Sequence, residues 1–180
     1  EQVLIVGDPR QLPPIVQSRD PYVIRAMGRS IFDVTVPEPE ESSNVALLDT
    51  QYRMHPDIGD FISEFFYGAY VKNGVTAEER SHIAGSGPYP GKPLILLDTG
   101  GIGKCETPEG SYSRYNEETA RLCVELGAKA VGASDVSVAI IAPYVEQSRR
   151  IRAMLSQRRI AGIECRTIHR FQGAERDVVI

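Results

Sequence analysis

The order of apolar and polar positions along the chain predicts alternating strands and helices. Short β-branched or apolar runs of the kind buried in parallel sheets occur at residues 2–6, 45–48, 94–98, 136–141, 163–168 and 178–180. Apolar residues at helical spacing predict helices over 56–66, 116–131 and 145–157, with Asn116 as the cap of the second, and residues 20–32 predict a short helix and loop. Strands that alternate with helices are typical of an α/β fold with a parallel sheet flanked by helices.

The helix over 56–66 begins with Pro56 and has a stripe that we expect to face the core: Ile58, Phe61, Ile62, Phe65 and Phe66. Arg53 lies between this helix and the apolar run 45–48. Strand-to-helix junctions are where α/β domains bind ligands. The alternative for a single arginine is a surface residue that pairs with a nearby carboxylate.

A second polar junction follows the run 2–6, where the chain reads Gly7-Asp8-Pro9-Arg10-Gln11-Leu12-Pro13-Pro14. Gly7 permits a tight turn, and Asp8 and Gln11 supply polar groups at the end of the predicted strand. A plain turn would explain Gly-Asp alone, but the full run is much more specific.

Two other stretches predict loops. Residues 36–44 are rich in proline and glutamate and form an expected acidic linker between domains. The turn Thr99–Cys105 looks at first like a phosphate-binding loop, but GxxxxGK[ST] needs glycine at Asp98 and serine or threonine at Cys105. We therefore do not expect a nucleotide site there.

Composition is that of an ordinary globular chain of 180 residues with a net charge of −4. Charge is uneven: residues 1–90 carry 7 Lys/Arg against 13 Asp/Glu, and residues 91–180 carry 13 against 11. Seven arginines and a single acid lie between Gln147 and Arg170, which is a basic stripe or a solvated helix face. Three cysteines without CxxC spacing indicate a reducing compartment, with neither disulfide framework nor zinc site.

No apolar run reaches the length of a membrane span, so no membrane association is expected. The chain starts without methionine inside an apolar run and stops inside another. We interpret it as a piece of a larger protein.

Four stretches, taken together and in order, resemble superfamily 1 helicases of the 5′-to-3′ branch, the senataxin and nonsense-mediated-decay helicase group. Gly7–Pro14 resembles motif III, Gln51–Pro56 resembles motif IV, Ala142–Gln147 resembles the Thr-Pro-Tyr-x-x-Gln stretch, and Thr167–Glu175 resembles motif V. The resemblance implies a RecA-like P-loop NTPase fold with an AAA domain. Residues 1–50 would end the first RecA-like domain and include the linker, and residues 51–180 would form most of the second domain.

The resemblance also implies an ATP site between the two domains. By motif position, Gln11 would sense the γ-phosphate, and Arg53 would reach the same phosphate from the second domain. An arginine fork suits this role because it donates two directed hydrogen bonds and stabilises charge on the transferred group. Tyr52 would lie against adenine, Glu175 would accept from ribose hydroxyls, and Gly173 would let the backbone approach the nucleotide.

On the nucleic-acid side, the resemblance implies contacts from Pro143 and Thr167 at strand ends, supplemented by Arg170 and the arginines of residues 149–159. Ala142 stands where the family usually has threonine, which removes one candidate contact. The expected partners are single-stranded RNA or DNA and the first helicase domain of the same protein, in an intracellular compartment (cytoplasmic, nuclear or nucleoid).

The 180 residues contain no GxxxxGK[ST], no Asp-Glu pair and no motif VI. ATP and Mg²⁺ would therefore be held mainly by other residues, with no metal ligands here, and the piece alone should neither hydrolyse ATP nor unwind a duplex. One alternative is an ATP-independent nucleic-acid or protein-docking module derived from a helicase, although Gln11, Arg53 and Glu175 together argue against it. A nuclease–helicase fusion is a third possibility that the residues neither support nor exclude.

Overall fold

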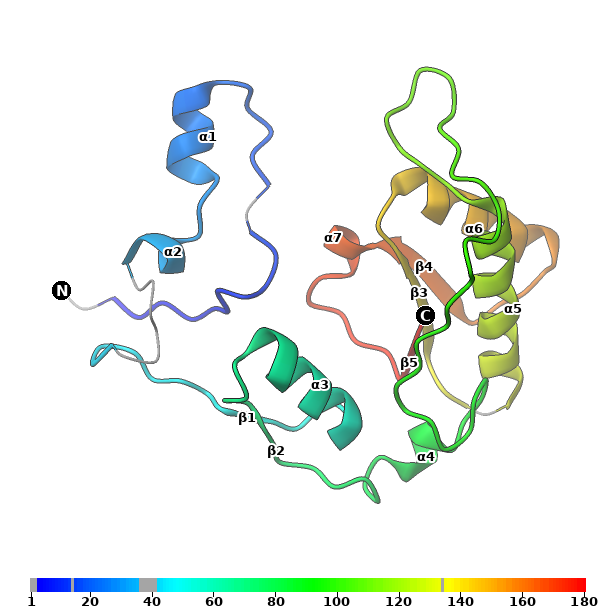
Figure 1. Cartoon of the computed structure of the whole chain (residues 1–180), viewed down its shortest axis with the longest axis horizontal. Coiled ribbons are helices and arrows are strands. Elements are labelled where there is room, and N and C mark those ends of the chain that lie inside the picture. Colours follow the sequence, from blue (N-terminus) through cyan, green and yellow to red (C-terminus); the bar gives the residue numbers. More distant parts are fainter. Residues whose placement is uncertain (1–2, 14, 36–41, 134) are drawn as a thin grey trace. The chain divides into compact units, whose positions relative to one another are not determined.

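The computed structural model describes residues 3–13, 15–35, 42–133 and 135–180 (Figure 1). The chain divides into two compact units. The N-terminal unit consists of Glu1–Tyr52 and Gly59–Gly74, and the C-terminal unit of Arg53–Ile58 and Val75–Ile180. Most of the predicted linker, residues 36–41, lies outside the described residues.

The C-terminal unit is built on a parallel sheet in the order β4-β3-β5 (Figure 1). The strands are β3 (Val138–Ala142), β4 (Ile163–Thr167) and β5 (Val178–Val179). β3 is central and nearly continuous in its burial, as expected for a strand covered on both faces of a parallel sheet. These three strands confirm the parallel α/β fold expected for the C-terminal part of the chain.

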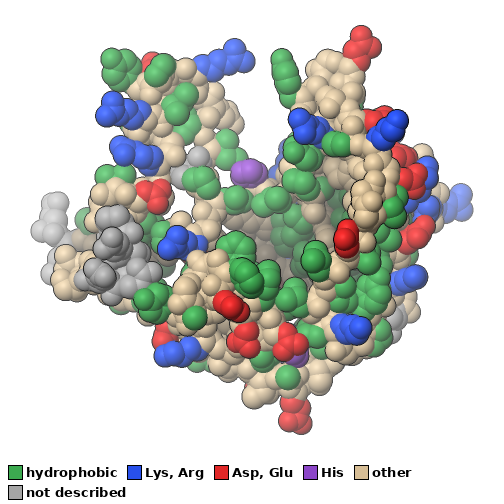
Figure 2. All heavy atoms as spheres, viewed as in Figure 1, with side chains coloured by type: hydrophobic (Ala, Val, Ile, Leu, Met, Phe, Trp, Pro, Cys, Tyr) green, Lys and Arg blue, Asp and Glu red, His purple; other side chains and the backbone are tan. Residues whose placement is uncertain are grey.

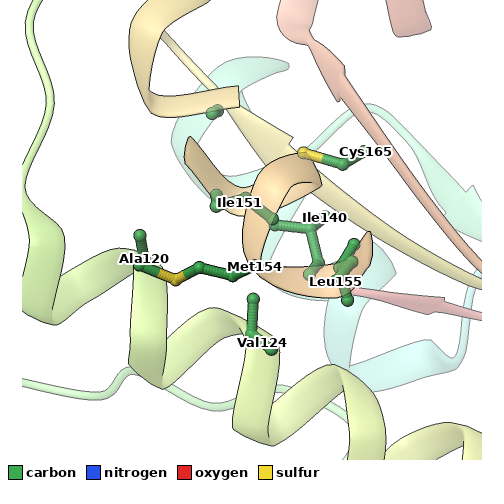
Figure 3. Packing of buried hydrophobic residues seen from close by; sticks show 8 residues of the cluster. Ala120, Val124, Ile140, Ile151, Met154, Leu155 and Cys165 are labelled. Carbon is green, nitrogen blue, oxygen red and sulfur yellow. The ribbon is translucent and has the colours of Figure 1, made fainter. Parts of the chain in front are cut away.

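Helices α5 (Glu117–Ala133) and α6 (Val145–Gln157) pack against each other and on β3 and β4. Their apolar sides meet the strands in one core, part of which Figure 3 shows, made of Ala120, Val124, Ile140, Ala142, Ile151, Met154, Leu155 and Cys165. The bounds of α6 agree with the predicted helix, and α5 ends two residues later than predicted. The unit also contains the short helices α4 (Ser81–Ala84) and α7 (Ile168–Phe171).

The N-terminal unit contains α1 (Pro21–Met27), α2 (Ile31–Thr35) and a short parallel pair, β1 (Thr50–Gln51) with β2 (Lys72–Asn73). Asp20 caps α1 by accepting a hydrogen bond from the N–H of Tyr22 at 2.8 Å. Helix α3 (Pro56–Phe66) has the predicted bounds, and its residues from Gly59 onward belong to this unit.

Three predicted strands were wrong. The described part of 2–6, and the runs 45–48 and 94–98, form no strand, and their large side chains are exposed, with Leu4, Leu48 and Leu96 between 86% and 94% exposed. A strand needs a neighbour for its backbone hydrogen bonds, and among the described residues none is paired with these runs. After the run 45–48, the residues that do pair are Thr50 and Gln51, which form β1.

The stripe of α3 that we expected to face the core is only partly confirmed, because its two isoleucines are half-buried. The helix buries Gly59 and Ser63, whereas Phe61, Phe65 and Phe66 are between 40% and 65% exposed. The phenylalanines contact one another instead, with the Phe61 and Phe65 ring centroids 4.7 Å apart. Hydrophobic side chains are accordingly visible at the surface in Figure 2. Among the described helices, none has the length and apolar character needed to cross a membrane.

Candidate nucleotide and nucleic-acid sites

Two of the expected ATP contacts lie side by side in the C-terminal unit. The Nε of Arg53 is 2.6 Å from Oε2 of Glu175, although 122 positions separate the two residues. Both side chains are exposed, at 70% and 67%. The backbone of Arg53 is held in turn by Arg80, whose Nε donates to the Arg53 carbonyl oxygen at 3.1 Å.

The turn before Glu175 explains how that carboxylate is presented. α7 ends at Phe171, and the Ala174 N–H donates back to the Phe171 carbonyl at 2.9 Å. Gly173 has a φ of 81°, a backbone conformation that residues other than glycine rarely adopt. A Cβ added at Gly173 would meet nothing within 4 Å. Open space and glycine geometry fit close approach of a ligand at this turn.

Tyr52 and Gln11, the other expected ATP contacts, belong to the N-terminal unit. The Tyr52 ring lies directly over Gly74, where a Cβ would overlap it, and the side chain is 66% exposed. Gln11 donates from Nε2 to Oδ2 of Asp8 at 2.9 Å, and its N–H donates to the Asp8 carbonyl at 3.2 Å. The Asp8 turn therefore fixes both the backbone and the amide of Gln11.

The expected nucleic-acid contacts gather at one edge of the sheet. Ala142 and Thr167 are register partners at the carboxyl ends of β3 and β4, which places Pro143 beside Thr167 at this edge. Pro143 is exposed and Thr167 half-buried, and the Thr167 side chain caps no backbone group of α7. Arg170 follows in α7 and is exposed.

The basic stripe of the sequence is largely paired with acids in the structure. Arg149 contacts Glu146, Arg150 contacts Glu117, Arg158 contacts Glu125, and Arg166 contacts Glu164. Arg150 also stacks over the Tyr115 ring, with its guanidinium carbon 4.1 Å from the centroid. Within the described ranges, Arg152, Arg159 and Arg170 form no ion pair.

A pocket of about 210 Å³ lies at the carboxyl end of β3. It is lined by Cys105, Arg114, Tyr115, Asn116, Thr119, Cys123, Ile141, Ala142, Pro143, Tyr144, Gln147 and Ile151. The pocket contains the thiol of Cys123, and burial raises the pKa of that thiol. A thiol with a raised pKa is a poor nucleophile at neutral pH, so the pocket has no reactive cysteine at that position.

Beside the pocket, a reciprocal pair of hydrogen bonds joins the starts of α5 and α6. The Oε1 of Gln147 accepts from the Asn116 N–H at 2.7 Å, and its Nε2 donates to the Asn116 carbonyl at 3.2 Å. Asn116 in turn caps α5, as predicted, by accepting from the Thr119 N–H at 2.9 Å. Gln147 is only 8% exposed, and its buried amide holds the start of α6 against the start of α5.

Sequence reasoning missed Tyr67. Its hydroxyl donates to Oδ2 of Asp8 at 2.6 Å. Tyr67 therefore contacts the turn that holds Gln11, although 59 positions separate it from Asp8 in the sequence. A tyrosine directly after a helix gives no pattern that would assign it to this turn. As for metals, the described part of the chain contains no group of three His, Cys, Asp or Glu side chains that could bind an ion.

Comparison with known proteins identifies the family. The AAA domain family matches residues 27–180. The chain is 29% identical over 185 residues to the 5′-3′ DNA helicase ZGRF1 of Mus musculus, 31% over 191 residues to the regulator of nonsense transcripts 1 homolog of Drosophila melanogaster, and 26% over 189 residues to the ATP-dependent helicase NAM7 of Saccharomyces cerevisiae. Each match covers 100% of this chain but only 10%, 16% and 19% of the respective relative.

The chain therefore belongs to the AAA domain family. The resemblance to superfamily 1 helicases and the α/β RecA-like fold are both confirmed. The chain spans less than a fifth of the length of these three relatives.

Proposed function

We propose that this chain is the part of an ATP-dependent helicase that carries one side of the nucleotide site and one edge of the nucleic-acid site. The activity would be ATP-driven translocation along single-stranded RNA or DNA, with 5′-to-3′ polarity. The observation that carries the proposal is the direct contact of Arg53 with Glu175, two candidate nucleotide contacts from distant parts of the chain.

The two side chains fit opposite parts of a nucleotide. Arg53 would donate to the γ-phosphate and stabilise charge that develops on it during phosphoryl transfer. Glu175 accepts hydrogen bonds only, which suits ribose hydroxyls. Since both side chains are exposed, their mutual ion pair is worth about 1 kcal/mol or less, so a nucleotide can replace it at small cost.

The remaining ATP contacts would be Gln11 at the γ-phosphate, Tyr52 against adenine and the backbone at Gly173. ATP supplies the phosphoryl group, and Mg²⁺ would neutralise its charge. Neither is held mainly by this chain, because the sequence has no GxxxxGK[ST] and no Asp-Glu pair. We therefore expect the 180 residues alone to show no ATPase activity, and the first helicase domain to be their partner.

Nucleic acid would bind at the sheet edge formed by Pro143 and Thr167. The Thr167 hydroxyl can donate to a phosphate oxygen, and Arg170 can neutralise a phosphate without first breaking an ion pair to a described residue. Backbone contacts of this kind position a strand without selecting its sequence. We place the protein inside the cell, which agrees with three cysteines that form no disulfide.

The test uses the whole gene product and measures ATP hydrolysis with and without single-stranded RNA and DNA. We expect stimulation by a nucleic acid, and Arg53→Ala should lower kcat at least about 100-fold, as expected for loss of a charge that stabilises the transferred phosphoryl group. Arg25→Ala is the matched control, because Arg25 is an exposed arginine in α1 that forms no ion pair with a described residue, and it should leave kcat unchanged.

Hydrolysis that survives Arg53→Ala would contradict the assigned role of Arg53. A gene product that binds single strands but hydrolyses no ATP under any condition would instead indicate an ATP-independent docking module. Comparison of the two nucleic acids identifies the substrate in the same experiment.

A further inference from the structure

The carboxylate of Asp8 gathers three hydrogen-bond donors within the N-terminal unit. The Arg10 N–H donates to Oδ1 at 2.9 Å, and the Gln11 amide donates to Oδ2 at 2.9 Å. The Tyr67 hydroxyl donates to the same Oδ2 at 2.6 Å. Arg10 and Gln11 belong to the turn itself, whereas Tyr67 brings a tertiary contact to it.

Tyr67 is held in place by contacts that do not involve Asp8. Its N–H donates to the Ser63 carbonyl at 3.0 Å, which continues the hydrogen bonding of α3 by one residue. The buried Ser63 hydroxyl donates to the Val71 carbonyl at 2.6 Å and fixes the returning chain. Gly68 and Ala69, with φ of 55° and 65°, turn the backbone directly after Tyr67. The tyrosine therefore reaches Asp8 from a fixed backbone position.

Orientation of the Gln11 amide depends on Asp8. A carboxylate only accepts hydrogen bonds, so the amide must direct its NH₂ group toward Asp8. The Oε1 and the second N–H of Gln11 then remain available, and neither has a hydrogen-bond partner among the described residues. Glutamine loses much rotamer freedom when it is fixed, so an amide that is already held avoids part of this cost when a ligand binds.

We propose, resting on the proposed function, that Tyr67 is a positioning residue for Gln11. Its hydroxyl fixes the Asp8 carboxylate, and this carboxylate holds the Gln11 amide ready for the γ-phosphate and the attacking water. Burial, together with the hydrogen bond to Asp8, raises the pKa of Tyr67 to about 12, so the hydroxyl remains a donor throughout the physiological range.

The experiment measures steady-state ATP hydrolysis by the whole gene product. Tyr67→Phe removes only the hydroxyl and should lower kcat about 10-fold, the loss expected for one hydrogen bond to a charged group, with the KM for ATP changed less than about 2-fold. Tyr70→Phe, three residues further on, is the matched control. The Tyr70 hydroxyl makes no hydrogen bond with a described residue, so both constants should stay at wild-type values.

A double-mutant comparison tests whether Tyr67 acts through Gln11. In a Gln11→Ala background, Tyr67→Phe should have no further effect on kcat, whereas a merely structural role would give the same 10-fold loss again. Asp8→Asn provides a second variant with the same shape, and it should likewise lower kcat at unchanged KM. If Tyr67→Phe lowers the melting temperature, Asp8→Asn decides the outcome.

Wild-type kcat in both Tyr67→Phe and Asp8→Asn, in a gene product that hydrolyses ATP, would overturn this inference and leave the proposed function intact. A wild-type product without ATPase activity would overturn both.

Discussion

Strand β3 and the run 94–97 are both short and apolar, but they differ in what lies beside them. β3 has β4 on one side and β5 on the other, and α5 and α6 cover its side chains. The run 94–97 has no strand partner among the described residues, and its leucines and isoleucine are between 40% and 94% exposed. Apolar, β-branched composition favours a strand, but a strand forms only where both its backbone and its side chains find partners.

The same contrast separates the two units. The C-terminal unit has a core in which Ile140, Ile151 and Val124 are 1% exposed or less. The described residues of the N-terminal unit bury mostly small groups, such as Gly59 and Ser63, and leave the phenylalanines of α3 exposed. We expect stability to be concentrated in the C-terminal unit, because buried apolar area is the dominant favourable contribution.

The largest effect should come from truncation in the core. Ile140→Ala removes a fully buried side chain from the central strand and should lower the free energy of unfolding by about 2–5 kcal/mol. Ile95→Ala is the matched control at a run without a strand partner, and the loss should be well below that of Ile140→Ala because Ile95 is 40% exposed. Denaturant unfolding measures both. Equal losses would mean that residues 94–97 are packed in solution as firmly as β3.

Loss of the Gln147 amide should rank second. Gln147→Leu keeps the volume but leaves the N–H and carbonyl of Asn116 without their partner, which should cost about 1–3 kcal/mol. Gln157→Leu, an exposed position in the last turn of α6, should change the melting temperature little. If the two variants melt alike, the reciprocal hydrogen bonds contribute nothing to the packing of α5 on α6.

Sequence patterns predicted the C-terminal part of the fold well because its helices and strands satisfy one another locally. The helix 145–157, the Asn116 cap and the strands near 138 and 163 follow from periodicity and capping within each segment. The runs 2–6, 45–48 and 94–98 failed because pairing is a property of two segments, which periodicity in one segment does not contain.

The candidate site also has a part that could be predicted from the sequence and a part that could not. Motif resemblance named Arg53 and Glu175, and the structure places them in contact, but no local pattern foretold that the two pair with each other. Tyr67 was missed for the same reason, since its role depends on a partner 59 positions away. The roles of Gln11, Tyr52, Pro143 and Thr167 stay predictions that the ATPase and binding experiments test.

Acid should weaken the pairing of β3 with β5 through Asp177. Its Oδ2 accepts from the Ser137 hydroxyl at 2.6 Å and from the Ser137 N–H at 2.8 Å, and these hydrogen bonds hold the pKa of Asp177 below its usual range. A lowered folded-state pKa contributes stability above the unfolded pKa of about 3.9, and this stability is lost as the pH falls through the lower folded value.

Asp177→Asn should therefore lower stability at pH 7 by about 1 kcal/mol and reduce the loss of stability below pH 4. Urea unfolding at several pH values measures both quantities. Asp135→Asn is the control, since Asp135 is exposed and accepts no hydrogen bond from a described residue. If stability below pH 4 falls as much in Asp177→Asn as in the wild type, other carboxylates are responsible for the acid sensitivity.

The smallest effect on stability should come from the residue expected to matter most for activity. Arg53 and Glu175 form an exposed ion pair, and such pairs typically contribute between 0 and 1 kcal/mol, because water screens the charges and two long side chains must be ordered. Arg53→Ala should thus leave the melting temperature nearly unchanged while ATP hydrolysis falls at least about 100-fold in the whole gene product. The opposite pattern, a large drop in melting temperature with hydrolysis retained, would make Arg53 a structural residue. In that case the contact with Glu175 would belong with the packing of the C-terminal unit, and the nucleotide site would have to be sought elsewhere.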